Sequence, residues 1–332
     1  MAIARRQLIN VESTPYYHCT SRCVRRAFLC GQDDYSGRSY EHRREWVESL
    51  LLKLGEAFCI DIVAYAVMSN HYHVILRVNL ELADSLTDIE IIDRWAMIYK
   101  PNRLMCDYQK GMSVTEEECE LIRETLTQWR TTLSNISRFM GYLNERIARE
   151  ANIEDKCTGR FWEGRFHSQA LLDAAALLRC MTYVDLNPVR AGISATPEES
   201  EHTSIKHRID QSHRGTPSVL MDFMVSKNQN QKTKGEVSVH ISDSTETLPL
   251  SFSEYLELLD WSSRLLREDK RGSVTSSTPD ILDRLGYTKK QWTSLLRPTS
   301  SWRPKALGSP EAMQVFCKAI GQRWVCQRNN TP

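Results

Sequence analysis

The amino-acid sequence predicts an α+β fold, in which helices pack on one face of a small antiparallel sheet. Short β-rich runs alternate along the chain with segments that carry apolar residues at helical spacing. Two of the β-rich runs are separated only by Ser69-Asn70, a turn signal that favours a hairpin and therefore antiparallel pairing. The 332 residues are 41% hydrophobic and 26% charged, close to the average of globular proteins, so the chain can form a sizeable core.

The first half of the chain supplies most of the predicted sheet. Residues 15–21 (PYYHCTS) have the aromatic and β-branched character of a strand. Residues 41–57 show helical spacing, and Gly55 is the expected stop of this helix. Residues 58–68 and 71–78 are the two predicted strands of the hairpin.

The second half continues with a helix, a strand and a further helix. Apolar residues return at helical spacing over 134–150, and residues 160–172 are typical of a strand or hairpin. Asp173 is the predicted N-cap of the next helix. This helix should end before Pro188, since the residue that precedes a proline disfavours helical geometry.

Composition divides the chain into a body and a tail. Residues 225–250 are polar and lack aromatic side chains, which is typical of a linker. The body is therefore expected to span residues 1–220, with a charged insertion at about 81–130 that we expect to be helical. Residues 251–326 are expected to form a helical C-terminal domain.

Capping motifs support helices in the tail. Ser251 with Glu254 forms a predicted capping box, and Thr288 with Gln291 forms another. The turn around Gly286 has the glycine of a helix-turn-helix, a motif that can bind DNA. Most such helix pairs are packing units, so both interpretations stay open.

Composition also excludes several classes of protein. No run approaches the ~18 consecutive apolar residues of a membrane span, and the N-terminus lacks the apolar stretch of a signal peptide. The ten cysteines include no C-x-x-C pair and are expected to be reduced thiols. We therefore expect a cytoplasmic protein without a membrane partner. Because 43 basic residues nearly balance 42 acidic ones, nucleic-acid binding would depend on local patches.

One such patch is predicted near the N-terminus, where residues 1–30 contain one acid, Glu12. The five basic residues of this segment are Arg5, Arg6, Arg22, Arg25 and Arg26. They are candidates for contacts with DNA phosphates, as is Arg179 in the second half of the chain. Chance clustering on a solvated surface is the alternative.

A pair of histidines lies on the second strand of the hairpin. His71 and His73 are two positions apart, so both point to the same face of the sheet, whereas Tyr72 points to the other. Their Cα atoms are about 6–7 Å apart along a strand, so the imidazoles can converge on one cation. Two ligands are fewer than a structural zinc site needs, but they suit a catalytic metal with open positions. Alternatively, both are polar residues beside a turn.

The helix after Asp173 carries a candidate nucleophile. Arg179, Tyr183 and Asn187 are spaced i, i+4 and i+8, which places them on one helix face. A tyrosine hydroxyl needs a nearby cation or base to act as a nucleophile at neutral pH, and a metal held by the histidines would supply one. Asn187 could give that metal a third, oxygen ligand. Taken alone, such a tyrosine is more often a packed side chain.

Four blocks together resemble the REP-associated tyrosine transposases, which belong to the single-tyrosine HUH class of transposases and single-strand nucleases. The blocks are PYYHCTSRCVRR, VMSNHYHVILRV, GRFWEGRFHSQ and YVDLNPVRAG, over roughly residues 5–215. The resemblance implies a ferredoxin-like sheet with the histidines on a central strand. It implies that His71, His73 and Asn187 hold Mg²⁺ or Mn²⁺, and that Tyr183 is the nucleophile.

The resemblance also implies a reaction. Tyr183 would attack a phosphate of single-stranded DNA at a hairpin (REP-like) sequence, which forms a 5′-phosphotyrosine and releases a 3′-hydroxyl. The reverse step would join a second strand.

The sequence also permits other hypotheses. The chain could recognise hairpin DNA, or act as a regulator, without needing catalysis. A barrel-type metal hydrolase would need further His and Asp ligands that the sequence does not offer. Cys19 and Cys23 near His18 could hold a metal, although packing thiols are favoured. The sequence leaves open whether the protein is a monomer or a homodimer.

Overall fold

The fold is that of a computed structural model, which describes residues 8–24, 29–32, 37–215, 219–224, 247–266, 282, 287–296 and 304–322. Several expectations fall outside these residues. Arg5, Arg6, Arg25 and Arg26 do so, as does most of the expected linker and the turn at Gly286. Their roles stay predictions.

The centre of the fold is a five-stranded sheet. Its strands are β1 (Tyr16–Arg22), β2 (Ile60–Val67), β3 (His71–Val78), β4 (His167–Leu171) and β5 (Ala306–Leu307), in the order β2-β3-β1-β4-β5. The first four pair antiparallel, and β5 joins β4 in parallel. A chain order of strand, helix, strand, strand, helix, strand with this neighbour order is the split βαβ, ferredoxin-like topology. The predicted α+β class and ferredoxin-like sheet are confirmed.

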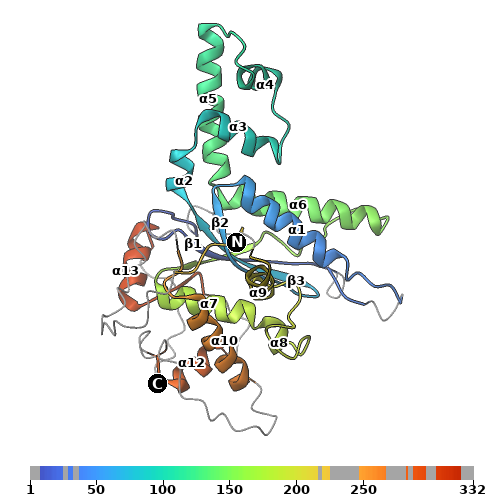
Figure 1. The fold of residues 1–332 in the computed structure, drawn as a ribbon, viewed down its shortest axis with the longest axis vertical. Coiled ribbons are helices and arrows are strands. Elements are labelled where there is room, and N and C mark those ends of the chain that lie inside the picture. Colours follow the sequence, from blue (N-terminus) through green and yellow to red (C-terminus); the bar gives the residue numbers. More distant parts are fainter. Residues whose placement is uncertain are drawn as a thin grey trace.

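Helices cover both faces of the sheet, as Figure 1 shows. The helices α1 (Arg43–Ala57) and α6 (Ile136–Glu154) pack together on one face. On the other face, α7 (Ala174–Asp185) contacts β2, β3 and β4, followed by α8 (Asn187–Arg190) and α9 (Ser204–Arg214). The expectation of helices on one face is therefore wrong. Apolar residues of the sheet are buried on both sides, those on the second face being Tyr16, Val63, Ala64, Ala66 and Ile75, so each face must be covered.

Gly55 has a packing role instead of the predicted role of helix stop. Helix α1 continues through Gly55 to Ala57. A Cβ atom at position 55 would lie 2.7 Å from the Cδ1 atom of Ile62 on β2. The glycine therefore permits the close approach of α1 to the sheet.

The charged insertion is helical, as expected. It comprises α2 (Leu80–Ser85), α3 (Asp88–Ala96), α4 (Arg103–Gln109) and α5 (Glu116–Leu133). The last three extend away from the sheet in Figure 1. Their common core includes the indole rings of Trp95 and Trp129, which stack with centroids 4.4 Å apart.

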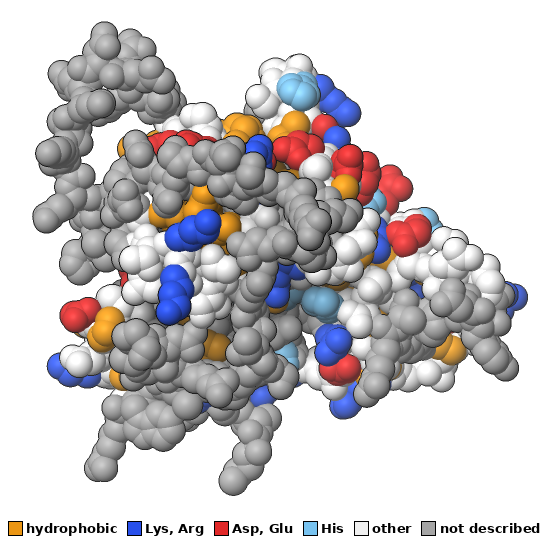
Figure 2. Space-filling view, turned by 90° about the horizontal axis from the view of Figure 1, so that it is seen from below, with side chains coloured by type: hydrophobic (Ala, Val, Ile, Leu, Met, Phe, Trp, Pro, Cys, Tyr) orange, Lys and Arg blue, Asp and Glu red, His pale blue; other side chains and the backbone are white. Residues whose placement is uncertain are grey.

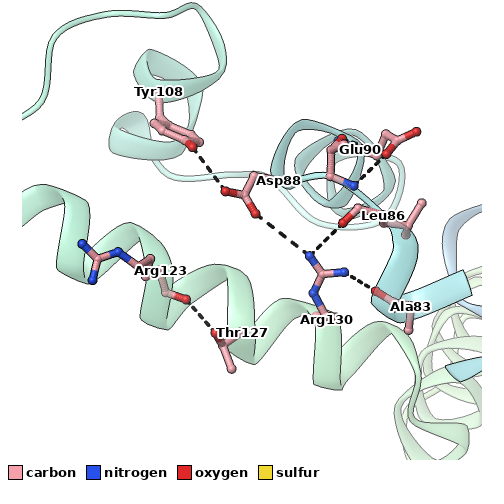
Figure 3. A network of polar contacts seen from close by, with 9 residues as sticks. Ala83, Leu86, Asp88, Glu90, Tyr108, Arg123, Thr127 and Arg130 are labelled. Carbon is pink, nitrogen blue, oxygen red and sulfur yellow. Dashed lines mark hydrogen bonds and ion pairs between the residues drawn. The ribbon is translucent and has the colours of Figure 1, made fainter. Parts of the chain in front are cut away.

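Arg130 joins three helices of the insertion. Arg130 on α5 donates to the carbonyl oxygens of Ala83 and Leu86 at the C-terminal end of α2 (Figure 3). It also faces Asp88 at the start of α3, with 4.0 Å between nitrogen and carboxylate oxygen. A cation at a helix C-terminus and an acid at a helix N-terminus both complement the helix dipoles. Arg130 thus fixes the angle between α2, α3 and α5.

The tail packs on the body through α10 (Phe252–Leu266), α12 (Lys289–Leu296), β5 and α13 (Pro310–Ala319). Both predicted capping boxes form: Ser251 exchanges hydrogen bonds with Glu254, and Thr288 does so with Gln291. Helices α10 and α12 contact α7 and share one apolar core with it. Strand β5, which the sequence did not predict, adds the tail to the sheet. Helices α10 and α12 therefore contribute to the layer that carries α7, whereas the buried residues of α13 belong to the core on the side of α1 and α6.

A buried polar contact fastens the tail to α7. The Tyr255 hydroxyl on α10 donates to the Asp185 carboxylate at 2.5 Å, and Ser204 donates to its other oxygen at 2.5 Å. Burial raises the pKa of Asp185, so this carboxyl depends on its donors.

We expect Tyr255→Phe to lower the free energy of unfolding by about 1–3 kcal/mol, because it leaves one buried oxygen of Asp185 without its donor. Urea unfolding measures this change. The matched control is Tyr142→Phe. The Tyr142 side chain is half-buried on α6, and its hydroxyl donates to the Ile98 carbonyl at 3.0 Å. Equal, small effects of the two changes would contradict this role of Tyr255.

Among the described residues, no helix combines the length and the apolar character that crossing a membrane requires.

Candidate active site

Three histidines gather on the face of the sheet that α7 covers. His71 and His73 lie on β3, and the register pairs them with Arg22 and Thr20 of β1. Residues opposite one another in an antiparallel pair share a face, and alternation then places His18 of β1 on that same face. His18 and His73 are buried, whereas His71 is half-buried. The predicted convergence of His71 and His73 on one face is present, and His18 joins them.

The histidines form a continuous line of short polar contacts. His71 Nε2 lies 3.1 Å from His73 Nε2, and His73 Nδ1 lies 2.9 Å from His18 Nε2. At one end, His71 Nδ1 lies 2.6 Å from the Asn70 side-chain oxygen. At the other end, His18 Nδ1 lies 3.4 Å from the side-chain oxygen of Gln169 on β4. The line thus crosses three neighbouring strands.

This line determines where the ring protons lie. The Gln169 amide nitrogen donates to the Pro304 carbonyl at 2.7 Å, so its oxygen faces His18 and accepts the Nδ1 proton. His18 Nε2 is then an acceptor and takes the proton of His73 Nδ1. The side-chain oxygen of Asn70 faces His71 Nδ1 and favours a proton on that nitrogen. With the protons of both neutral rings on Nδ1, the facing Nε2 atoms of His71 and His73 both carry lone pairs.

Two lone pairs at 3.1 Å repel one another unless a cation lies between them. That separation suits adjacent ligands of one ion, since metal–ligand distances are about 2.0–2.1 Å. In the described part of the chain, no group of three or more His, Cys, Asp or Glu side chains is arranged to hold a metal. His18 is no third ligand, because its Nε2 is engaged by His73. The residues fit a two-histidine cation site with open positions.

Tyr183 lies against this cluster. Its ring is half-buried on α7, and its centroid is 5.5 Å from that of His73 at an interplanar angle of 89°. The His18 ring centroid is 6.3 Å away. Helix α7 begins at the predicted N-cap, Asp173, whose carboxylate accepts from the Ala176 amide at 2.8 Å. The structure therefore brings together Tyr183, His71 and His73, which are far apart in sequence.

Arg190 is a neighbour of Tyr183 that the sequence pattern did not indicate. Its guanidinium carbon lies 4.7 Å from the centroid of the Tyr183 ring, in a cation–π contact. Arg190 ends the short helix α8 and is half-buried. The separation of Tyr183 and Arg190 by seven positions does not predict this contact, because the two residues lie on separate helices, α7 and α8.

Asn187 and Arg179 differ from their predicted arrangement on one helix. Helix α7 ends at Asp185, and Asn187 begins α8, so the three residues do not share one continuous helix face. The buried amide nitrogen of Asn187 makes no hydrogen bond within the described residues. A role of Asn187 as metal ligand stays a prediction. Arg179 is half-buried, and burial lowers the pKa of its guanidinium. The electrostatic effect of Tyr287 in the tail acts in the opposite direction and raises this pKa.

Of the five arginines near the N-terminus that are predicted to contact DNA, Arg22 lies within the described residues. It is exposed at the end of β1, opposite His71. Figure 2 views the molecule from the side of α10 and α12, and histidine side chains lie beside Lys and Arg side chains near the middle of this face. An exposed arginine next to the cluster is well placed to contact a bound anion.

His18 stands out in the sequence only as a neighbour of Cys19 and Cys23. Adjacent residues of a strand point to opposite faces, so Cys19 packs in the core under α1 and α6 while His18 faces α7. The favoured interpretation of the cysteines as packing thiols agrees with this burial. In the sequence, the spacing of His18 by two residues from Tyr16 and Thr20 on a predicted strand indicates that the three side chains share one face.

No protein-family model matches the chain, and no curated protein is similar to it in sequence. A search of solved structures finds a REP-associated tyrosine transposase bound to a REP hairpin, the family that the sequence motifs resemble. The identity is 12%, with 69% of this chain and 96% of that chain covered, and the TM-score is 0.37.

Proposed function

We propose that the protein is a metal-dependent endonuclease and strand transferase for single-stranded DNA, acting at hairpin sequences through a covalent bond to Tyr183. One observation carries the proposal: the Tyr183 ring lies 5.5 Å from His73, whose Nε2 faces that of His71 at 3.1 Å. A nucleophile beside a site for a cation is the arrangement that phosphoryl transfer requires.

The cation would be Mg²⁺ or Mn²⁺, held by His71 and His73 with Asn187 as an expected third ligand. When bound, it supplies positive charge that polarises a DNA phosphate and stabilises charge developing on its oxygens. The exposed Arg22 and the half-buried Arg190 would bring further positive charge to the same phosphate.

Tyr183 performs the bond change itself. Its hydroxyl oxygen attacks phosphorus and its proton passes to solvent, while the bond from phosphorus to the 3′-oxygen breaks. The leaving 3′-oxygen takes up a proton, and the DNA 5′-phosphate stays attached to Tyr183. In the reverse step, the 3′-hydroxyl of another strand displaces the tyrosine, so the number of phosphodiester bonds is conserved.

The test is incubation of the purified protein with a panel of labelled hairpin oligonucleotides and Mn²⁺. We expect a protein–DNA adduct that survives denaturing electrophoresis, with release of a fragment ending in a 3′-hydroxyl. Binding of hairpins without any adduct, across the panel and with either metal, would instead favour the alternative of a DNA-binding protein without catalysis.

Arg190 should influence the rate of this reaction. We expect Arg190→Met to slow adduct formation by about 3–10-fold, since a cation–π contact of about 0.5–1 kcal/mol and a nearby positive charge are both lost. Arg190→Lys keeps the charge and should lose less. Single-turnover rates at saturating DNA measure the effect, and equal rates for wild type and Arg190→Met would show that the contact is only structural.

A further inference from the structure

We propose that His18 is a positioning residue, held by Gln169 and the tail, that fixes the tautomer and orientation of His73 for binding a cation. The inference deepens the proposed function and rests on it for the role of the cation. His18 is itself neither a metal ligand nor a nucleophile, because its Nε2 is engaged by His73 Nδ1 at 2.9 Å.

The first step is the demand on His73. A ring nitrogen can bind a cation only while it carries a lone pair, and a neutral imidazole has one such nitrogen. His73 Nε2 faces His71, so the ring must keep its proton on Nδ1. The acceptor that favours a proton on Nδ1 is His18 Nε2. A hydrogen bond from the second nitrogen of a metal-binding histidine commonly fixes tautomer and ring orientation in this way.

The second step is the demand on His18. It can accept from His73 only if its own proton lies on Nδ1, which faces the Gln169 oxygen at 3.4 Å. The Gln169 amide could present either its oxygen or its nitrogen to His18. Its nitrogen donates to the Pro304 carbonyl at 2.7 Å, and this contact selects the oxygen. The orientation of one amide therefore determines the tautomers of two histidines.

The third step is the origin of the Pro304 carbonyl. Pro304 precedes β5, which pairs in parallel with β4 next to Gln169, with Ala306 opposite Ala170. The tail strand thus places a fixed acceptor 135 positions away in sequence from Gln169. Because the strand pairing holds its backbone, the tail completes the line of hydrogen bonds that ends at the cation site.

The rigid setting supports a positioning role. His18 and His73 are 7% and 1% exposed, and their rings are 20° from parallel with centroids 5.1 Å apart. Neither ring can rotate freely in such a site, so the hydrogen bond between them is kept in the folded protein.

The experiment compares His18→Leu with His18→Gln in the full-length protein. Leucine fills a similar volume without an acceptor, whereas the glutamine oxygen reaches about as far as Nε2 and can accept from His73 Nδ1. His213→Leu removes an exposed histidine on α9 and is the control for general loss of an imidazole. Urea unfolding and circular dichroism establish that each variant is folded.

Two measurements need no DNA cleavage. In metal-free protein at pH 8, nitrogen-15 NMR of the imidazoles should show His73 protonated on Nδ1 in wild type and His18→Gln, and a redistribution of that proton in His18→Leu. Titration with Mn²⁺ followed by electron paramagnetic resonance should show a Kd about 10–100-fold higher for His18→Leu, as for other lost partners of metal-bound histidines. Gln169→Leu should raise the Kd less.

A third measurement separates positioning from chemistry. If His18 only orients His73, high Mn²⁺ concentrations should restore most of the cleavage rate of His18→Leu, so the half-saturating metal concentration changes more than kcat. A folded His18→Leu protein with wild-type Mn²⁺ affinity and an unchanged His73 tautomer would overturn the inference. Failure of the proposed function gives a different result, in which wild type forms no DNA adduct although the tautomer and Mn²⁺ measurements agree with the expectation.

Discussion

Tyr183→Phe should abolish the covalent protein–DNA adduct while the protein keeps its fold. The substitution removes only the hydroxyl, and the half-buried ring can keep its contacts with His73 and Arg190. A side chain that acts only in packing would lose at most one hydrogen bond, about 0.5–1.5 kcal/mol of stability, and activity would persist. A nucleophile cannot be replaced by a phenyl ring, so cleavage should fall by a factor on the order of 10⁴ or more.

Adduct formation on denaturing gels and mass spectrometry of the modified peptide measure this result. The matched controls are Tyr65→Phe and Tyr72→Phe, which remove the tyrosine hydroxyls of the hairpin strands β2 and β3. Tyr65 donates to Glu48 at 2.6 Å and Tyr72 donates to Asn144 at 2.7 Å, and both rings pack in the core on the α1 and α6 side. We expect wild-type adducts from both. An adduct formed by Tyr183→Phe at the wild-type rate would contradict the proposed mechanism.

The Tyr183→Phe protein should still bind hairpin DNA and Mn²⁺, because phosphate contacts and the histidine pair are separate from the lost hydroxyl. Filter binding at several salt concentrations measures the first property, and a Mn²⁺ titration measures the second. If DNA binding were lost together with cleavage, Tyr183 would be a DNA contact instead of a nucleophile.

The pair His71 and His73 could be predicted from sequence because the strand alternation that aligns them is local. The same holds for the hairpin strands, the Asp173 N-cap and the capping boxes of the tail, each of which depends on a few consecutive residues. His18 could not be placed with them. Its contact with His73 depends on the register between two strands 55 positions apart, which the sequence pattern leaves open.

The tail shows the same limit on a larger scale. Helical caps predicted α10 and α12, but caps do not say which surface a helix covers. The two residues of β5 are too short to give an alternating pattern, so neither the added strand nor the Pro304 contact with Gln169 could be anticipated. Coverage of the second sheet face results from the packing of α7 against α10 and α12 of the tail.

Replacement of His71 or His73 should remove cleavage by removing the cation site. His71→Ala is the cleaner change, because His71 is half-buried and ends the line of contacts, with its Nδ1 on Asn70. His73→Ala also removes the hydrogen bond to the Nε2 atom of buried His18, so we expect it to lower the free energy of unfolding by about 1–3 kcal/mol in addition. In both variants the charge that stabilises the attacked phosphate is lost, and cleavage should fall by at least about 10²–10³-fold.

The same assay with EDTA should give the same loss in wild type, and added Mn²⁺ should restore wild type but neither variant. Hairpin affinity, measured without metal, should change little, since base and phosphate contacts lie outside the pair. His213→Ala on α9 controls for the loss of an exposed imidazole and should leave both cleavage and Mn²⁺ binding unchanged. Undiminished cleavage by His71→Ala, or by wild type in EDTA, would contradict the assignment of a catalytic metal to the facing Nε2 atoms of the two histidines.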